Sequence, residues 1–240
     1  MSGWEAAKTE KTNMTDAVFK SLEELGHWRD LPDEEMTANA RDFFEEIARR
    51  HTIRDFRADA VPLDAIKHCV AAAGRAPNGA NHQPWHFVVI GDQETKRKIR
   101  EAAEEEERAF YGGRAGAEWL NALAPIGTDA DKPFLETAPY LIAVFAQRRG
   151  GLAQGDDKKN YYIHESVGIA CGFLIAALHH AGFATLTHTP NPMTFLGDVL
   201  DRPSTEKAYL LIVVGRPARD AGVPEHALKK KALKDIMTIV

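Results

Sequence analysis

The sequence predicts one folded unit built from both helices and strands. Two continuous apolar runs, Pro139 to Phe145 and Tyr209 to Val214, are typical of strands that are covered on both faces of a sheet. Between them, residues 161–181 are apolar nearly all round, which is the pattern of a helix buried on every side, in part by another subunit. With 240 residues and 44% hydrophobic content, the chain can bury a substantial core without a second domain.

The first elements are expected to be helical. Residues 1–32 are polar with one amphipathic patch, and we expect them to form an arm. Asp33 is a plausible N-cap for a helix whose apolar residues repeat at helical spacing. Pro62 starts a second helix, which stops at Gly74. The arm should therefore be followed by a single domain over residues 33–240.

A distinctive loop and a strand come next. Residues 76–85, APNGANHQPW, are rich in Pro, Gly and Asn and lead into the apolar strand Trp85 to Ile90. Gly79 permits main-chain angles and a close approach that a Cβ would block, so a planar ligand could meet main-chain amides there. The alternative is a plain connection between helix and strand, because any loop uses these residue types.

The rest of the chain alternates charged and apolar segments. Gln93 to Tyr111 reads as a long charged helix, and the glycines that follow should make the next segment mobile, giving a lid over about residues 100–132. Phe183 to Thr187 is a weaker strand candidate. The apolar end, Ile236 to Val240, is too short to be a stable strand alone, and we expect it to pair with a partner subunit's sheet.

Composition excludes several classes of protein. A formal charge of -5 and a pI near 6.1 argue against a nucleic-acid binder, which would carry a basic stripe. No segment reaches the roughly 18 apolar residues of a membrane span, and the amino end lacks a signal-peptide core. Cys69 and Cys171 lie in apolar helical patterns and are expected to be buried thiols in a reducing cytoplasm. His179, His180 and His188 lack a ligand quartet, so no metal is expected.

A cationic motif lies upstream of the loop. Residues 49–56, RRHTIRDF, form a helix end that runs into an extended segment. Taken as one helical turn apart, Arg50 and Arg54 could converge on a phosphate, because bidentate charge-assisted hydrogen bonds are strong. The alternative for Arg50 is a cation that favours a helix carboxyl end. Together with the loop at 76–85, this motif resembles the nitroreductase superfamily of FMN-dependent enzymes.

The acidic segment narrows the resemblance to one branch. The four glutamates at 104–107 are usually a solvated helix face, and that remains the alternative. Yet Glu107 and Tyr111 lie at i and i+4 and share a face. With Lys132, and with Trp119 and Leu123 between them, they are similar in type and spacing to the lid of the iodotyrosine deiodinases. The resemblance spans about residues 33–240.

The resemblance implies a fold, an activity and a set of site residues. The fold is α+β, a mixed sheet flanked by helices, in an intertwined homodimer with FMN in clefts at the interface. The activity is reductive dehalogenation of halotyrosines, in which Thr189 donates its hydroxyl to flavin N5 and the amide of Ala80 receives the phenolate. Glu107, Tyr111 and Lys132 hold the zwitterionic end of the substrate. The implied FMN contacts are Arg50, His51, Thr52, Ile53, Arg54, Pro77, Asn78, Gly79, Thr187, His188, Thr189 and Lys230.

The chain departs from the branch at several points. Asn78 stands where the family has Ser, and Lys230 stands where the deiodinases usually have Arg, which keeps the charge but loses the fork. The animal deiodinases carry a membrane anchor, whereas this chain is expected to be soluble. Thr189 before Pro190 is also an ordinary turn residue. Two other functions stay open: a general NAD(P)H-dependent nitro or quinone reductase, and a flavin- or halotyrosine-binding protein without turnover.

Overall fold

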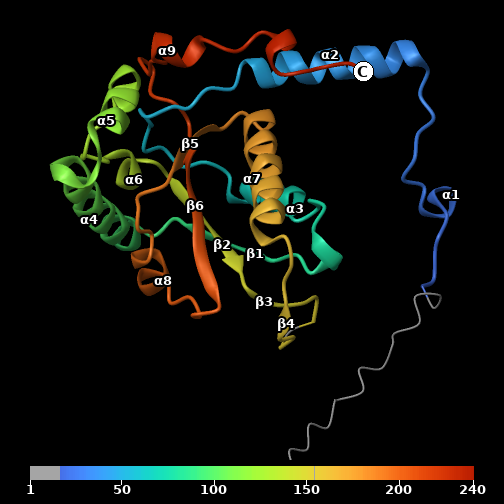
Figure 1. Ribbon diagram of the computed structural model, residues 1–240, viewed down its shortest axis with the longest axis horizontal. Helices are drawn as coiled ribbons and strands as arrows, with labels where there is room; N and C mark the ends of the chain where they lie inside the picture. Colours follow the sequence, from blue (N-terminus) through green and yellow to red (C-terminus); the bar gives the residue numbers. More distant parts are fainter. Residues whose placement is uncertain (1–16, 154) are drawn as a thin grey trace, which may run out of the picture. The chain divides into compact units, whose positions relative to one another are not determined.

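The computed structural model describes residues 17–153 and 155–240 (Figure 1). The chain forms two compact units, the first ending at Phe44 and the second spanning Glu45–Val240. In the first, a capping box between Ser21 and Glu24 begins α1 (Leu22–Leu25). Helix α2 (Asp33–Ala48) confirms the first predicted helix, with Asp33 as its first helical residue and not as its N-cap. Residues 1–16 of the predicted arm lie outside the described residues.

A four-stranded sheet of order β1-β2-β6-β5 forms the centre of the second unit. Its strands are β1 (Trp85–Ile90), β2 (Tyr140–Gln147), β5 (Ala184–His188) and β6 (Glu206–Gly215). All four strands confirm the sequence prediction, and each neighbouring pair is antiparallel. A single parallel bridge, from Thr52 to Thr185, adds the cationic motif to the free edge of β5 and makes the sheet mixed.

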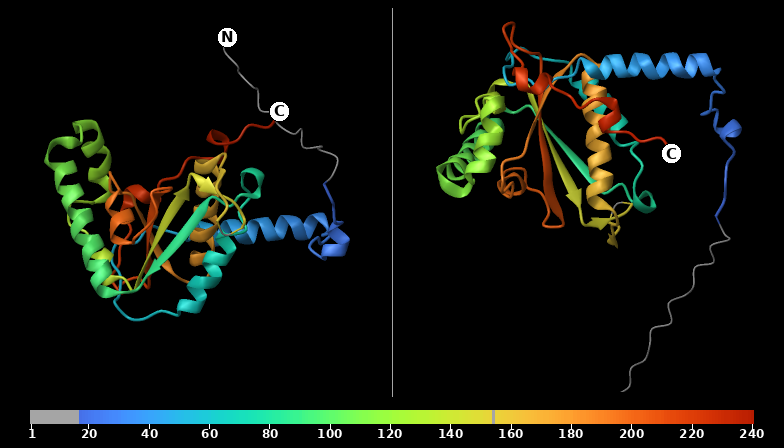
Figure 2. Two further views of the ribbon diagram at one scale, coloured as in Figure 1. Left: turned by 90° about the horizontal axis from the view of Figure 1, so that it is seen from below. Right: turned by 45° about the horizontal axis from the view of Figure 1, so that its top comes forward.

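Helices cover both faces of this sheet. Figure 1 shows α4, α6 and α8 on one side and α3 and α7 on the other, and Figure 2 shows the same two layers from below. Their bounds are α3 (Leu63–Ala73), α4 (Gln93–Ala109), α6 (Phe134–Thr137), α7 (Ile163–His180) and α8 (Phe195–Val199). The helices predicted after Pro62, over 93–111 and over 161–181 are confirmed.

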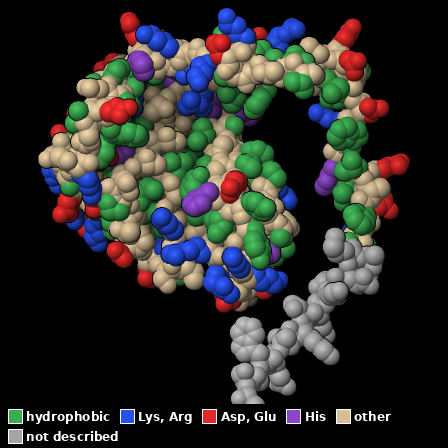
Figure 3. All heavy atoms as spheres, in the orientation of Figure 1, with side chains coloured by type: hydrophobic (Ala, Val, Ile, Leu, Met, Phe, Trp, Pro, Cys, Tyr) green, Lys and Arg blue, Asp and Glu red, His purple; other side chains and the backbone are tan. Residues whose placement is uncertain are grey.

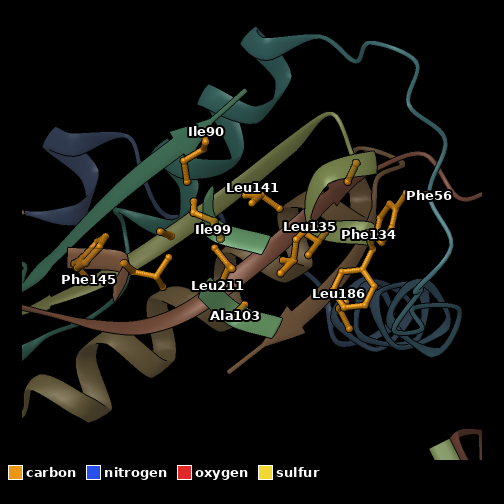
Figure 4. Close-up of a cluster of buried hydrophobic side chains, with 14 residues drawn as sticks. Phe56, Ile90, Ile99, Ala103, Phe134, Leu135, Leu141, Phe145, Leu186 and Leu211 are labelled. Carbon is orange, nitrogen blue, oxygen red and sulfur yellow. The ribbon is translucent and has the colours of Figure 1, made fainter. Parts of the chain in front are cut away.

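Each face of the sheet has its own hydrophobic core. On one face, Leu211 and Val213 of β6 pack with Ile99 of α4 in the cluster drawn in Figure 4. On the other face, Ile212 of β6 packs with Leu174 of α7. Successive strand residues point to opposite faces, and both faces here are covered, so the whole run must be apolar.

Short elements complete the chain. The lid region consists of a π-turn, η2 (Phe110–Arg114), followed by α5 (Ala117–Leu123) and η3 (Ala124–Ile126). The predicted break after α4 is present, since Gly113 has a φ of 142° inside η2. The other short elements are η1 (Gly79–Asn81), β3 (Arg149–Gly150), β4 (Lys158–Lys159), α9 (Glu225–Leu228) and η4 (Leu233–Asp235).

Two features concern the ends and surface of the chain. Residues 236–240 join no strand among the described residues, so their predicted pairing with a partner subunit stays a prediction. Within the described ranges, no helix has both the length and the apolar character that a bilayer crossing needs.

Candidate functional site

A cavity of about 420 Å³ lies between the lid region and the carboxyl end of β5. Trp119 and Leu123 of α5 contribute to one wall. The predicted site residues that line it are Thr52, Arg54, Glu107, Tyr111, Lys132, Thr187, His188 and Thr189. Residues far apart in the sequence therefore converge here, because the lid and the edge of the sheet lie on either side of one cavity.

An ion pair lies at the wall of this cavity. Lys132 Nζ is 3.6 Å from Glu107 Oε2, and the two side chains are only 3% and 14% exposed. Burial raises the pKa of Glu107, and the nearby Lys132 ammonium opposes that rise. The pair thus offers a carboxylate and an ammonium side by side in a site that is largely shielded from water.

The lid residues hold the Lys132 side chain in place. Its ammonium donates to Thr128 Oγ1 at 3.2 Å and also to the Asp129 carbonyl. The Tyr111 hydroxyl donates to the Thr128 carbonyl at 3.1 Å, and its ring centre lies 5.8 Å from Lys132 Nζ. Glu107 is in the last turn of α4 and Tyr111 in η2, so the predicted shared face is confirmed.

His188 forms another part of the wall. Its ring is 8% exposed and stands edge-on to Phe134 at 5.8 Å, and its Nε2 has no hydrogen-bond partner among the described residues. Burial, with a smaller effect from Lys132, lowers the pKa of His188 to about 3. The imidazole is therefore neutral, and it adds no positive charge to the cavity near pH 7.

The cationic motif lies along the edge of β5 in an extended conformation. Helix α2 ends at Ala48, so the interpretation of Arg50 and Arg54 as one helical turn apart is wrong. Ile53 donates its N–H to the Thr185 carbonyl at 3.1 Å, which directs Arg54 toward the cavity. Neither arginine forms an ion pair with another residue in 17–153 or 155–240, although both are half-buried. An anion could therefore be their partner.

The predicted loop at 77–80 is not part of this cavity. It precedes β1, and the cavity lies beside β5 at the opposite edge of the sheet. Two strands lie between, so the two edges are about 14 Å apart at the usual spacing of about 4.8 Å. Within one chain the structure therefore separates Pro77, Asn78, Gly79 and Ala80 from the lid trio. The clefts at a dimer interface that the resemblance implies, in which two chains would bring these groups together, stay a prediction.

Contacts within the chain account for the composition of the loop. Asn78 closes it by donating to the Ala76 carbonyl at 3.1 Å and accepting from the Gln83 N–H at 2.7 Å. A Cβ on Gly79 would lie 2.8 Å from the Tyr161 carbonyl oxygen, so a larger residue would clash. Ala80 has a φ of 51° and an exposed side chain. Its main chain is held in a conformation that few residues adopt, on the surface of the protein.

The remaining predicted residues do not line the cavity. Lys230 is exposed, and its ammonium donates to the Ala227 carbonyl at 2.7 Å. His51 and Ile53 belong to the strand-like segment beside β5, where Ile53 packs against the core. The expected role of Lys230 beside Arg50 and Arg54 stays a prediction.

Sequence reasoning missed two residues at this site. Thr128 contacts both Tyr111 and Lys132, but a single threonine in a polar stretch carries no pattern that marks it. Glu104 was expected on a solvated face and is 9% exposed. It pairs with Arg100, four residues earlier on the helix, at 2.7 Å. The spacing of Arg100 and Glu104 by four residues was the available signal, and it does not show that Glu104 also contacts the Lys132 N–H.

Comparison with known proteins identifies the family. A model of the nitroreductase family matches residues 47–216, which include the sheet, the lid and the cavity. This chain belongs to the nitroreductase family. Within that family it is similar to the iodotyrosine deiodinase of Haliscomenobacter hydrossis, with 51% identity over 83% of this chain and 90% of the relative. It is also similar to mouse iodotyrosine deiodinase 1, with 45% identity over 87% of this chain and 73% of the relative.

Solved structures of the nitroreductase family confirm the fold. The crystal structure of oxidised iodotyrosine deiodinase bound to FMN and 3-iodo-L-tyrosine aligns with a TM-score of 0.65 and 30% identity. The alignment covers 74% of this chain and 90% of that chain. The predicted α+β class, a sheet flanked by helices on both faces, is therefore confirmed.

Proposed function

We propose that this chain catalyses FMN-dependent reductive dehalogenation of halotyrosines. The observation that carries the proposal is the shielded pair of Glu107 and Lys132, 3.6 Å apart at the cavity. A halotyrosine is a zwitterion, so its ammonium requires a carboxylate and its carboxylate requires a cation. Glu107 and Lys132 offer both, and Tyr111 lies beside them. The similarity to iodotyrosine deiodinases supports the same substrate class.

The donors around the cavity fit the anionic cofactor. Arg50 and Arg54 are half-buried cations without a carboxylate partner in the described ranges, as a phosphate site requires. Thr187 lies near the end of β5 and Thr189 directly follows the strand, and both are exposed at the cavity. Thr52 and the neutral His188 complete that edge. We assign these residues to FMN: they would hold the cofactor, and the Thr189 hydroxyl would be the donor to N5.

The chemistry divides between cofactor and chain. When bound, FMN supplies the two electrons that, with one proton, convert an aryl carbon–iodine bond to carbon–hydrogen and release iodide. The lid trio orients the amino-acid end and excludes water from the site. The main-chain amide of Ala80 receives the phenolate, which favours the reactive ring form. Electrostatic positioning of this kind is the protein's own contribution.

We also propose that the active form is a homodimer. The loop at 77–80 and the cavity lie at opposite edges of the sheet, so a second copy would be needed to bring the phenolate and FMN contacts of the loop to the cavity. Hydrophobic side chains are visible over α7 in Figure 3, where Ile169 and Phe173 are 41% and 44% exposed. The exposed apolar tail at 236–240 adds further surface to cover. Pairing of this tail with the partner's sheet would complete the interface.

Three further assignments accompany the proposal. The catalytic domain comprises residues 33–240, with a lid at about 100–132. Cys69 and Cys171 are free and buried, which supports a reducing compartment such as the cytoplasm. A nicotinamide cofactor, NADPH or NADH, is a candidate source of electrons for FMN.

The main competing function is that of a general nitro or quinone reductase. Such an enzyme would not need the lid trio, and saturating NADPH would bleach its flavin quickly. A binding protein without turnover would take up halotyrosine and release no iodide. Anaerobic incubation with dithionite and 3-iodotyrosine tests all three, because only a dehalogenase releases iodide. The Glu107→Gln variant in the same assay should lose most of that activity at low substrate concentration while retaining its FMN.

A further inference from the structure

Glu104 is a buried carboxylate with two well-defined partners. Its Oε1 accepts the main-chain N–H of Lys132 at 2.9 Å, and its Oε2 accepts from Arg100 Nη1 at 2.7 Å. The residue lies in a run of four glutamates, yet it is only 9% exposed, whereas its neighbour Glu105 is exposed and forms no side-chain hydrogen bond or ion pair with residues 17–153 or 155–240. One glutamate of the run is therefore hydrogen-bonded to the segment that precedes α6.

Two carboxylates of α4 contact the two ends of the same lysine. Glu104 holds the main-chain N–H of Lys132, and Glu107, one turn later, faces its ammonium at 3.6 Å. The Lys132 carbonyl accepts from the Leu135 N–H at 3.0 Å. The lysine is thus fixed on both sides of its Cα before its side chain enters the cavity.

We propose that Glu104 is a positioning residue for substrate binding, which sets the Lys132 ammonium against Glu107 by fixing the main chain of Lys132. The inference rests on the proposed function for its consequence, because Lys132 is the partner of the substrate carboxylate. Glu104 itself does not line the cavity, so it acts through Lys132 and not by contact with the ligand.

An ion pair and a buried hydrogen bond between α4 and the α6 segment support the orientation of Glu104. Arg100 Nε donates to Glu136 Oε2 at 2.6 Å, which connects α4 to α6 next to Glu104. Lys96, 3% exposed, donates to the Ala138 carbonyl at 2.7 Å and ties the other end of α6 to α4. The carboxylate therefore has one permitted direction, since Arg100 fixes one oxygen and leaves the other for Lys132. Fixed supporting contacts of this kind are what keep a binding group within a fraction of an ångström of its working position.

A double-mutant cycle on the FMN-loaded protein tests the route through Lys132. We expect Glu104→Ala to weaken 3-iodotyrosine binding by about tenfold or more in the parent, and by less than about twofold in a Lys132→Met background. FMN content and nitroaromatic turnover should stay at the parent level, and Glu105→Gln is the matched control from the same run. Equal losses in the two backgrounds, or no loss in the parent, would overturn the proposal.

Amide exchange of Lys132 gives a readout that needs no substrate. Glu104→Ala should speed exchange of the Lys132 N–H by about tenfold or more, because its acceptor is removed. Glu104→Gln, which keeps an acceptor oxygen, should largely restore protection, and Glu105→Gln should leave it unchanged. If Glu104→Ala fails to fold, Glu104→Asp is the second variant, since its shorter side chain cannot hold Arg100 and Lys132 together.

The two measurements separate this inference from the proposed function. A parent protein that does not bind 3-iodotyrosine contradicts the function, while Lys132 exchange still decides the role of Glu104. Unchanged Lys132 exchange in both Glu104→Ala and Glu104→Asp would refute the positioning role even if the parent binds substrate.

Discussion

Glu107 Oε2 and Lys132 Nζ lie 3.6 Å apart, although one residue belongs to α4 and the other precedes α6. The lysine side chain is 3% exposed and the glutamate 14%, so both charges have lost most of their water. Such burial is costly, and the mutual attraction of the pair offsets it only in part. Both side chains lie at the wall of a cavity. When a zwitterionic ligand enters, the carboxylate can pair with the ligand's ammonium and the lysine with the ligand's carboxylate.

Removal of either charge should weaken halotyrosine binding. Glu107→Gln and Lys132→Gln should each raise the dissociation constant of 3-iodotyrosine by about tenfold or more, because each leaves a ligand charge unpaired in a shielded site. Titration calorimetry on the FMN-loaded proteins measures this. FMN content and nitroaromatic reduction should not change, and Glu105→Gln serves as a control. Unchanged binding in both variants would contradict the assignment of the lid trio to the substrate.

Acidification should also weaken binding, through Glu107. Burial raises the pKa of this carboxyl above its ordinary value of 4.5, so it takes up a proton at a higher pH than a free glutamate does. The carboxylate needed by the substrate ammonium is present above that raised pKa and is lost as the pH falls through it. Affinity measured from pH 7 downward should therefore fall at pH values above 4.5. In Glu107→Gln this loss of affinity at low pH should be absent. If the parent and the variant lose affinity over the same pH range, a group other than Glu107 is responsible.

Flavin retention should depend on Arg50 and Arg54, which have no carboxylate partner in residues 17–153 and 155–240. Arg54→Ala should weaken FMN binding by roughly tenfold to hundredfold, because a hydrogen bond to a charged group contributes about 1.5–3 kcal/mol. Arg49→Ala is the matched control, since Arg49 belongs to the same motif but pairs with Glu46 and is exposed. The ratio of flavin to protein after dialysis measures the effect. A full complement of FMN in an Arg50→Ala, Arg54→Ala double variant would contradict the assignment of these arginines to the phosphate.

His188 should make the fold less stable in acid. Its pKa falls from 6.5 to about 3 on folding, so the unfolded chain binds a proton that the folded chain does not. The free energy of unfolding should therefore decrease as the pH drops below about 6.5, with a slope approaching roughly 1.4 kcal/mol per pH unit. Urea titrations of the parent and His188→Gln at several pH values would measure the difference. His180→Gln, at an exposed ring, should retain the parent's slope.

The carboxyl-terminal tail should be needed for assembly. Residues 236–240 are exposed and join no strand in the part of the chain that the structure describes, so a second copy is the proposed partner. Removal of these five residues should therefore reduce both dimer and bound FMN in sedimentation velocity. Ile239→Asp in the full-length chain should act in the same direction. A shortened protein that sediments as a flavin-loaded dimer contradicts the prediction.

The fold could be predicted from the sequence where a pattern reflects burial. Strands β2 and β6 were recognised because both of their faces are covered, which leaves no polar position in the run. The β3–β4 pair could not be recognised, since two residues per strand carry no periodicity. The order of the strands is also absent from local patterns, so the separation of Gly79 from Thr189 within one chain could not be derived from them; only the resemblance implied clefts at a dimer interface.

The site could be predicted where spacing falls inside a regular element. Glu107 and Tyr111 share a face because the helical turn continues from α4 into η2. The same spacing misled for Arg50 and Arg54, because α2 had already ended at Ala48. The buried Glu104 carboxylate accepts the main-chain N–H of Lys132. A contact with the main chain cannot be read from residue types, so the sequence did not indicate it.

Single-turnover iodide release tests the central claim most directly. The FMN-loaded protein is reduced with dithionite without excess, under anaerobic conditions, and mixed with 3-iodotyrosine, and iodide is then counted against flavin. Two electrons per reduced FMN correspond to one carbon–iodine bond, so we predict about one iodide per flavin, and a much slower release from 2-iodophenol, which lacks the zwitterion. Absence of iodide from 3-iodotyrosine, in a protein whose FMN is readily reduced by NADPH and reoxidised by nitroaromatics, would contradict the assignment and leave a general reductase.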